Sequence, residues 1–274
     1  MIIRITPSET ERNAHAFSNA TLDKASHCMR MEGVLILEDI VNPALIFEAR
    51  QAFTQRYDRY LDGGEHDDAL EVGGRRSMIT VDLAPPFDQR ELFANLWLFP
   101  VLTAVFKGDF VLGAYGVVSS LPGAPRQHIH ADGGYLFPGQ WGLNYMLPIA
   151  AVTVAIPLLE MNNVHGTTAL WPGSHRDETR GPKLNRDERR DSVEVGEEPL
   201  VREGSCVLWD YRLRHSGTPN RSAVPRPLLY SMYCRPWFVD HENYRKQAPL
   251  RVPKGFLADL PEDLRRLLVR AQEG

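Results

Sequence analysis

The segment "RQHIHADGG", residues 126–134, carries His128, His130 and Asp132 on alternate positions of the chain. In an extended strand alternate residues share one face, so His128, His130 and Asp132 are predicted to point the same way. Burying three such groups on one face is costly unless a partner compensates. A divalent metal ion is such a partner, because imidazole and carboxylate groups on one strand can ligate it together. The alternative for an isolated His-x-Asp pattern is a polar edge strand in water.

A second segment, "WDYRLRHSGTPNRS" (residues 209–222), supplies a further histidine, His215, after a β-rich run and before a turn. Arg226 opens the strand that follows. His130, Asp132 and His215 together match a 2-His-1-carboxylate facial triad, which binds one face of iron(II) and leaves three positions open. A bidentate 2-oxo acid can occupy two of these positions and dioxygen the third. Arg226 is predicted to bind the far carboxylate of that acid through its planar guanidinium.

The layout of the chain predicts helices first and short strands later. Helices are expected at residues 21–32, from 42 onward, at 88–107 with Pro100 kinking or splitting it, and at 261–271. Strands are expected at residues 33–39, 110–119, 151–158, 167–171, 205–209 and 227–233. This order favours a mainly β sandwich or barrel with helices packed on one side. No linker composition marks a boundary, so we expect one domain over residues 1–274, with the catalytic barrel at about 108–237.

At these motifs the sequence resembles the phytanoyl-CoA dioxygenase family of iron(II)/2-oxoglutarate oxygenases, from about residue 33 to 237. The resemblance rests on "GVLILEDIVNP" (33–43), "TTALWPGSHR" (167–176) and "RHSGTPNRS" (214–222) followed by Arg226. It implies a double-stranded β-helix, a jelly-roll or cupin-like barrel, with an N-terminal helical layer backing one sheet. It also implies that His130, Asp132 and His215 are the iron ligands. By the same likeness Arg226 holds the C5 carboxylate of 2-oxoglutarate.

Two further contacts with the co-substrate are implied by the same resemblance. One is Gln127, three residues before the first iron ligand, and the other is Thr168, with Thr167 as the alternative. Strict strand alternation would put Gln127 on the opposite face from His130, so this assignment requires a bend near Pro125.

His128 has no counterpart in the family motif. It is expected either to lie beside the iron or contact the substrate, or to be a polar residue near the barrel mouth. Family members often carry Trp at the position of Ile129.

Other classes on the same barrel fit these residues less well. A cupin with a non-redox metal usually adds a Glu soon after its histidine pair, where this chain has Gly133, Gly134 and Tyr135. An iron halogenase replaces the carboxylate with Gly or Ala, whereas Asp132 is present here. A non-catalytic metal-binding protein on this barrel is expected to have lost a ligand or the arginine, and neither is lost.

Net charge, apolar runs and cysteine content limit which partners and which cellular compartment are expected for this chain. The formal net charge is −4 and the isoelectric point about 6.1, which argues against nucleic acid and anionic membranes as partners. No apolar run is long enough for a membrane helix, and no secretory signal is visible. Three scattered cysteines favour a reducing compartment, so we expect a cytoplasmic protein. A homodimer is left open.

The expected enzyme is therefore a non-haem iron(II) dioxygenase with 2-oxoglutarate and O2 as co-substrates. It would oxidise an unactivated C–H bond of a small molecule by hydroxylation, with desaturation, epoxidation or rearrangement as further outcomes. A natural product or metabolic intermediate is favoured as the substrate, because no basic cluster suits a CoA nucleotide. The alternatives are an acyl-CoA or amino-acid hydroxylase of the same family.

Overall fold

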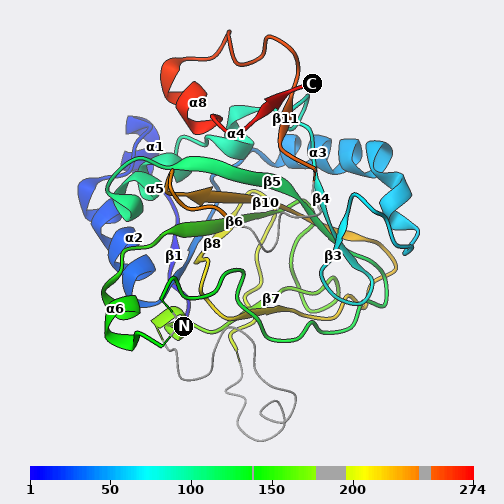
Figure 1. Cartoon of the computed structure of the whole chain (residues 1–274), viewed down its shortest axis with the longest axis horizontal. Helices are drawn as coiled ribbons and strands as arrows, with labels where there is room; N and C mark the ends of the chain where they lie inside the picture. The colour runs from blue at the N-terminus through cyan, green and yellow to red at the C-terminus, as the bar shows by residue number, and fades with distance from the viewer. Residues whose placement is uncertain (138, 177–195, 241–247) are drawn as a thin grey trace, which may run out of the picture.

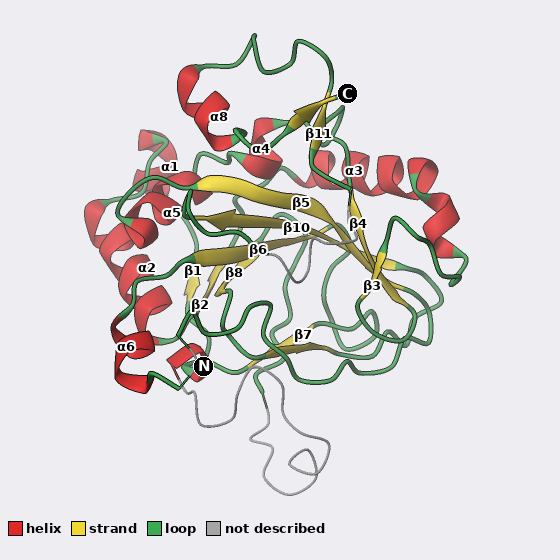
Figure 2. Cartoon of the chain, viewed as in Figure 1, coloured by secondary structure: helices red, strands yellow, loops and turns green. Residues whose placement is uncertain are grey.

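A large mixed sheet crosses the molecule, with helices along one face and a small second sheet on the other side (Figure 1, Figure 2). The computed structural model describes residues 1–137, 139–176, 196–240 and 248–274. The large sheet has the strand order β1-β2-β8-β6-β10-β5-β4-β3. The second sheet pairs β7 with β9, and a third pairs β11 with β12 near the carboxyl end.

The strands are β1 (Arg4–Ile5), β2 (Val34–Leu37), β3 (Leu70–Glu71), β4 (Arg76–Thr80), β5 (Val111–Ser120), β6 (Ala151–Pro157), β7 (Thr168–Leu170), β8 (Cys206–Asp210), β9 (His215–Gly217), β10 (Arg226–Cys234), β11 (Arg251–Val252) and β12 (Gln272–Glu273). The helices are α1 (Glu9–Ala14), α2 (Asn19–Met31), α3 (Pro43–Arg56), α4 (Arg90–Phe93), α5 (Leu98–Phe106), α6 (Trp141–Met146) and α8 (Glu262–Leu267), with 3-10 turns at Asp58–Leu61 and Ser174–Arg176.

Helix α3 illustrates how local sequence sets the helical layer. The Asn42 side chain accepts a hydrogen bond from the Ala44 N–H at 2.9 Å, and Pro43 occupies the first helical position, where no N–H is needed. The buried residues Ile46, Ala49 and Phe53 recur at helical spacing and pack against the large sheet. The helix expected from residue 42 onward is confirmed.

The helix expected at 88–107 is split, but not where the proline predicted. Helix α4 ends at Phe93 and α5 begins at Leu98, with Asn95 between them. The Asn95 Oδ1 accepts hydrogen bonds from the N–H groups of Trp97 and Leu98, which caps the second helix. Pro100 lies in the first turn of α5, where it removes no helical hydrogen bond, so it does not cause the break.

The central strands of the large sheet are buried on both faces. Every residue of β6, β8 and β10 is buried. One face packs against the helices, and the opposite face encloses the interior together with β7. Burial on both faces explains why these strands have nearly continuous apolar sequences.

The second sheet closes the other side of the interior. Strands β7 and β9 are antiparallel, and an isolated bridge between His130 and His215 extends this sheet by one more segment. A large sheet backed by helices and faced by a smaller sheet is the predicted jelly-roll arrangement. Within the described residues, no helix has the length and apolar character required to cross a bilayer.

Candidate metal centre

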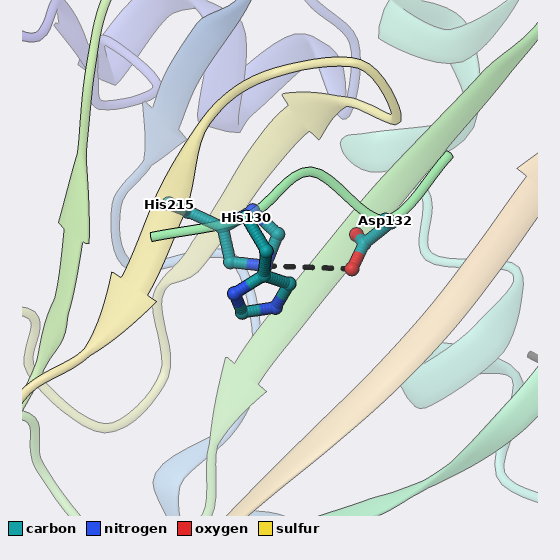
Figure 3. Close-up of side chains that lie close together, drawn as sticks. All are labelled: His130, Asp132 and His215. Carbon is teal, nitrogen blue, oxygen red and sulfur yellow. Dashed lines mark ion pairs between the residues drawn. The ribbon is translucent and has the colours of Figure 1, made fainter. Parts of the chain in front are cut away.

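Two imidazoles and one carboxylate converge between the two sheets (Figure 3). Potential ligand atoms of His130, Asp132 and His215 all lie within 4.8 Å of one another. The His215 Nε2 is 3.4 Å from the Asp132 Oδ1, and the two imidazole centroids are 4.3 Å apart. Neighbouring ligands on an octahedral ion with bonds of about 2.1 Å lie about 3 Å apart. The 3.4 Å separation is close to this spacing, whereas the 4.8 Å limit for the whole cluster is wider.

Backbone pairing holds the two histidines opposite each other. The His130 N–H donates to the His215 carbonyl at 3.0 Å, and the His215 N–H donates to the His130 carbonyl at 2.7 Å. Directly opposed residues in such a pair project their side chains from the same face. Residues that are distant in sequence are thereby brought to one point.

Both histidines are oriented by a carbonyl two residues earlier in the chain. The His130 Nδ1 is 2.9 Å from the His128 carbonyl oxygen, and the His215 Nδ1 is 3.0 Å from the Leu213 carbonyl oxygen. A carbonyl only accepts, so each Nδ1 carries the hydrogen and each Nε2 is left as the nitrogen that can ligate a metal. This repeated contact fixes the tautomer as well as the ring direction.

The extended strand expected for residues 126–134 is not formed. Only His130 makes a ladder bridge. Gln127 donates its backbone N–H to the Gly217 carbonyl, and His130 donates to the His215 carbonyl. The two donors lie three positions apart on this segment, whereas the two acceptors lie two positions apart on β9. The extra residue breaks strand alternation, as a β-bulge does. His128 is exposed, with its ring 5.0 Å from that of His130.

The Asp132 carboxylate is held from the large sheet. Its Oδ2 accepts hydrogen bonds from the Thr153 hydroxyl at 2.8 Å and from the Trp209 indole N–H at 3.0 Å. The interpretation of the sequence did not identify either residue. Thr153 is a single hydroxyl in the apolar run of β6, which is the only signal that could have indicated it.

The charges within the cluster are strongly coupled. Burial, together with the positive charge of His215, lowers the pKa of His130 to about 4. Burial opposes ionisation of Asp132, but the charge of His215 and its hydrogen bond take the pKa of Asp132 well below its usual range. Burial alone would lower the pKa of His215, yet the Asp132 carboxylate raises it. Near neutral pH the cluster therefore contains a neutral His130 and an ionised carboxylate, which are the forms that bind metal ions.

Arg226 is buried and lacks a carboxylate partner among the described residues. Its side chain is 2% exposed, its Nε has no hydrogen-bond partner in the described part of the chain, and its Nη1 is 4.0 Å from the Met161 sulfur. Burial and the nearby charge of Arg76 lower the pKa of Arg226 to about 10. The side chain remains charged near neutral pH, and a buried charge without a counter-ion is costly. The site thus favours an anion.

A second buried arginine, Arg76, lies on the same cross-strand row as Arg226, which consists of Arg76, Ser120 and Arg226. The sequence did not indicate this residue. Arg76 on β4 and Arg226 on β10 both pair with Ser120 of β5, so the three side chains project from the same face. Arg76 donates to the carbonyls of Pro125 and Thr218, but its Nε has no hydrogen-bond partner among the described residues, and neither has the Ser120 hydroxyl. The row offers unused hydrogen-bonding groups beside Arg226.

The amide of Gln127 is already bound on both sides. Its Oε1 accepts from the Gly217 N–H at 2.7 Å, and its Nε2 donates to the Val72 carbonyl. A Cβ at Gly217 would overlap the Gln127 amide and lie 3.3 Å from the Arg76 Nε, so a larger residue there would have to displace the Gln127 amide. One amide N–H of Gln127 remains for another acceptor.

The structure separates the two candidate threonines. Thr168 pairs with Gly217 on the face that also carries Leu170 and His215, and it makes no side-chain hydrogen bond within the described residues. Thr167 instead donates its hydroxyl to the Pro199 carbonyl at 2.5 Å. Of the two, Thr168 is the one directed toward the interior.

The barrel carries two histidines and one carboxylate in a cluster that could hold a metal ion, and it also buries an arginine that has no carboxylate partner in the described part of the chain. This combination is typical of a class of metal-dependent enzymes. The sequence matches the model of the phytanoyl-CoA dioxygenase (PhyH) family over residues 29–228. The chain belongs to this family. The predicted family and enzyme class, a dioxygenase and hence an oxidoreductase, are confirmed.

Individual relatives agree with this membership. The chain is 22% identical over 277 residues to the dioxygenase cdmA of Talaromyces verruculosus, covering 96% of this chain and 87% of the relative. It is 24% identical over 225 residues to the Fe(II)/2-oxoglutarate-dependent dioxygenase nvfF of Aspergillus novofumigatus, covering 76% and 71%.

Solved structures confirm the predicted fold. AviO1 of Streptomyces viridochromogenes matches with a TM-score of 0.61 at 22% identity, covering 82% of this chain and 99% of that one. HygX of Streptomyces hygroscopicus, solved with nickel and 2-oxoglutarate bound, matches with a TM-score of 0.59 at 16% identity, covering 82% and 89%.

Proposed function

We propose that this chain is an iron(II)- and 2-oxoglutarate-dependent dioxygenase that oxidises an unactivated C–H bond of a small molecule. His130, Asp132 and His215 bind the iron, and Arg226 binds the C5 carboxylate of 2-oxoglutarate. The observation that carries the proposal is the convergence of two imidazoles and one carboxylate between the sheets of a barrel that also buries an arginine with no carboxylate partner among the described residues.

The donor set suits iron(II). Imidazole and carboxylate are its usual protein ligands, and three of them on one face leave three positions for other molecules. An iron(II) ion held there supplies, with 2-oxoglutarate and dioxygen, the oxidising power that removes hydrogen from a C–H bond. The protein's contribution is to hold these ligands in fixed directions and to orient the co-substrate and substrate against them.

The row containing Arg226 suits the carboxylate end of 2-oxoglutarate. Arg226 supplies a charged fork of donors, and Arg76 adds a second positive charge with an Nε–H that no acceptor among the described residues binds. Ser120 lies between them and contributes a hydroxyl. A bound dicarboxylate would satisfy buried groups that have no hydrogen-bond partner in the part of the chain that the structure describes.

Gln127 and Thr168 are proposed as weaker contacts with the co-substrate. Thr168 is supported by its inward direction beside β9. Gln127 is supported only by its remaining amide N–H, because both atoms of its amide already bind backbone groups. We expect Gln127 to act chiefly through the position of Gly217.

A natural product or metabolic intermediate is proposed as the substrate. Support comes from solved relatives: the epimerase SnoN comes from nogalamycin biosynthesis, and HygX has been solved with hygromycin B bound. Acyl-CoA and amino-acid substrates are the alternatives that a substrate panel must include.

We also propose that residues 1–274 form one domain in the cytoplasm. The three free cysteines support a reducing compartment. Sedimentation would decide between a monomer and a homodimer.

The test is 2-oxoglutarate turnover against a substrate panel, with succinate and the product mass as the readouts. We expect iron-dependent succinate formation, raised by the correct substrate, and a product heavier by one oxygen if the outcome is hydroxylation. The His130→Ala, Asp132→Ala and His215→Ala variants should each lose nearly all turnover. Undiminished succinate formation in these variants would contradict the proposal.

A further inference from the structure

The two oxygens of the Asp132 carboxylate have different surroundings. Oδ1 faces the two histidines of the cluster, 3.4 Å from the His215 Nε2. Oδ2 faces the large sheet and accepts two hydrogen bonds, from the Thr153 hydroxyl at 2.8 Å and the Trp209 indole N–H at 3.0 Å. The carboxylate is thus held so that one oxygen points into the cluster and the other points away from it.

The two donors form a single cross-strand pair. Thr153 of β6 and Trp209 of β8 are register partners in the large sheet, so their side chains project from the same face. Both residues are buried, with 6% and 5% exposure. The Trp209 ring also lies 5.3 Å from the His215 ring, measured between centroids. Two paired strands of the large sheet therefore fix a carboxylate that itself comes from an irregular segment.

We infer that Thr153 and Trp209 are positioning residues that restrict Asp132 to coordination through Oδ1. The inference rests on the proposed function, since it concerns the iron of that site. A carboxylate without these bonds could rotate, so it would hold the metal less firmly through Oδ1 and could also bring Oδ2 to the metal. The second oxygen would then occupy one of the three positions required by 2-oxoglutarate and dioxygen. Hydrogen bonds to Oδ2 also compensate for the burial of the carboxylate charge.

This role differs from ordinary packing in a measurable way. Groups that orient a metal ligand typically change metal affinity by about 10- to 100-fold when they are removed. Packing residues change the melting temperature without a selective effect on the metal. The Trp209→Phe variant keeps the ring and removes the N–H, and Thr153→Val keeps the shape and removes the hydroxyl. Thr153→Ser keeps the hydroxyl and should restore affinity.

A matched control is available in the helical layer. Trp97 is also buried, at 9% exposure, and its ring packs edge-on against Phe17 with centroids 5.0 Å apart. Trp97→Phe therefore repeats the same chemical change on the helix-packed side of the sheet. Melting temperatures of all variants report whether folding is retained.

The experiment is anaerobic isothermal titration calorimetry of iron(II) into the apo 274-residue chain. We expect Trp209→Phe and Thr153→Val each to weaken iron binding by about tenfold or more, while Thr153→Ser and Trp97→Phe stay near the wild-type value. The second readout is the affinity for 2-oxoglutarate, measured by anaerobic titration into the iron-loaded protein. This affinity should be weaker in a variant that combines Trp209→Phe with Thr153→Val than in the wild type.

The outcomes separate the two claims. Wild-type iron affinity in both Trp209→Phe and Thr153→Val would overturn the inference and leave the proposed function intact. Equal losses in Trp97→Phe and Trp209→Phe would also overturn it, because the effect would then be structural. Failure of the wild-type chain to bind iron(II) would overturn both claims.

Discussion

At the scale of single residues, the backbone does as much as the side chains to build the site. His128 contributes its carbonyl oxygen, which orients the His130 ring, while its own side chain is exposed. The carbonyl is present whatever side chain stands at position 128. The roles of His128 and His130 can therefore be distinguished by mutating each residue in turn.

We expect His130→Ala to abolish iron binding and nearly all turnover, because the facial site needs its Nε2. The matched variant His128→Ala retains the carbonyl and should retain iron binding. Both effects are measured by iron titration and succinate formation. If His128→Ala were inactive and His130→Ala active, the wrong histidine would have been assigned as the ligand.

Arg226 provides the second residue-scale prediction. Arg226→Ala should raise the KM for 2-oxoglutarate by roughly tenfold or more, since a charged hydrogen-bonded pair is worth about 1.5–3 kcal/mol. Arg226→Lys should fall between the wild type and Arg226→Ala, because lysine keeps the charge but not the planar fork. Iron affinity should be unchanged in both variants. An unchanged KM in Arg226→Ala would mean that the co-substrate carboxylate binds elsewhere.

At the scale of elements, one carboxylate joins the first two helices. Glu11 completes a capping box with Ser8 at the start of α1. The same carboxylate accepts hydrogen bonds from the Ser18 N–H at 2.9 Å and the Thr21 hydroxyl at 2.6 Å, at the start of α2. The Thr21 and Ser18 bonds are the main reason that the pKa of Glu11 falls to about 2.

Replacing Glu11 should therefore destabilise the helical layer. We expect Glu11→Gln to lower the free energy of unfolding by roughly 2 kcal/mol at neutral pH. A carboxylate with a lowered folded-state pKa stabilises fully above its unfolded value of 4.5, and this stability is lost as pH falls through 2. The difference between wild type and Glu11→Gln should narrow over that range in denaturant titrations. Glu9→Gln, on an exposed side chain of the same helix, is the control, and an equal loss there would contradict the prediction.

The elements with clear periodicity could be predicted from sequence. Helices α2 and α3 and strands β5, β6, β8 and β10 lie close to their expected positions because capping residues and apolar runs mark them. The segment before Asp132 could not be predicted as it is. Its form depends on a mismatch of one residue against β9 and on a Gln127 side chain that replaces a backbone acceptor. The alternation of residues along the local sequence indicates neither the mismatch nor the role of the Gln127 side chain.

The candidate site was predictable to a similar extent. His130, Asp132, His215 and Arg226 stand in motifs whose residue types indicate their chemistry. Their partners lie in strands that look like ordinary core. Which face of β6 or β8 carries a given side chain is decided by the register of the whole sheet, so Thr153 and Trp209 emerge only in three dimensions.

At the scale of the whole molecule, ligands that bind only the folded chain should stabilise it. A ligand at a hundredfold excess over its Kd contributes about 2.7 kcal/mol. We expect manganese(II), as a redox-stable substitute for iron(II), to raise the melting temperature and 2-oxoglutarate to raise it further. Arg226→Ala should keep the increment from the metal and lose most of the increment from 2-oxoglutarate. A full 2-oxoglutarate increment in Arg226→Ala would contradict the proposed anchor.

The most direct measurement is anaerobic titration of 2-oxoglutarate into the iron(II)-loaded chain, followed by its metal-to-ligand charge-transfer band. The band requires the co-substrate to chelate the iron itself, so it reports both ligands at one site. The wild-type chain should develop the band with saturation at one equivalent, and His215→Ala should not develop it. A wild-type chain that binds iron(II) but gives no band, or a His215→Ala variant that gives the full band, would contradict the assignment of this cluster as an iron and 2-oxoglutarate site.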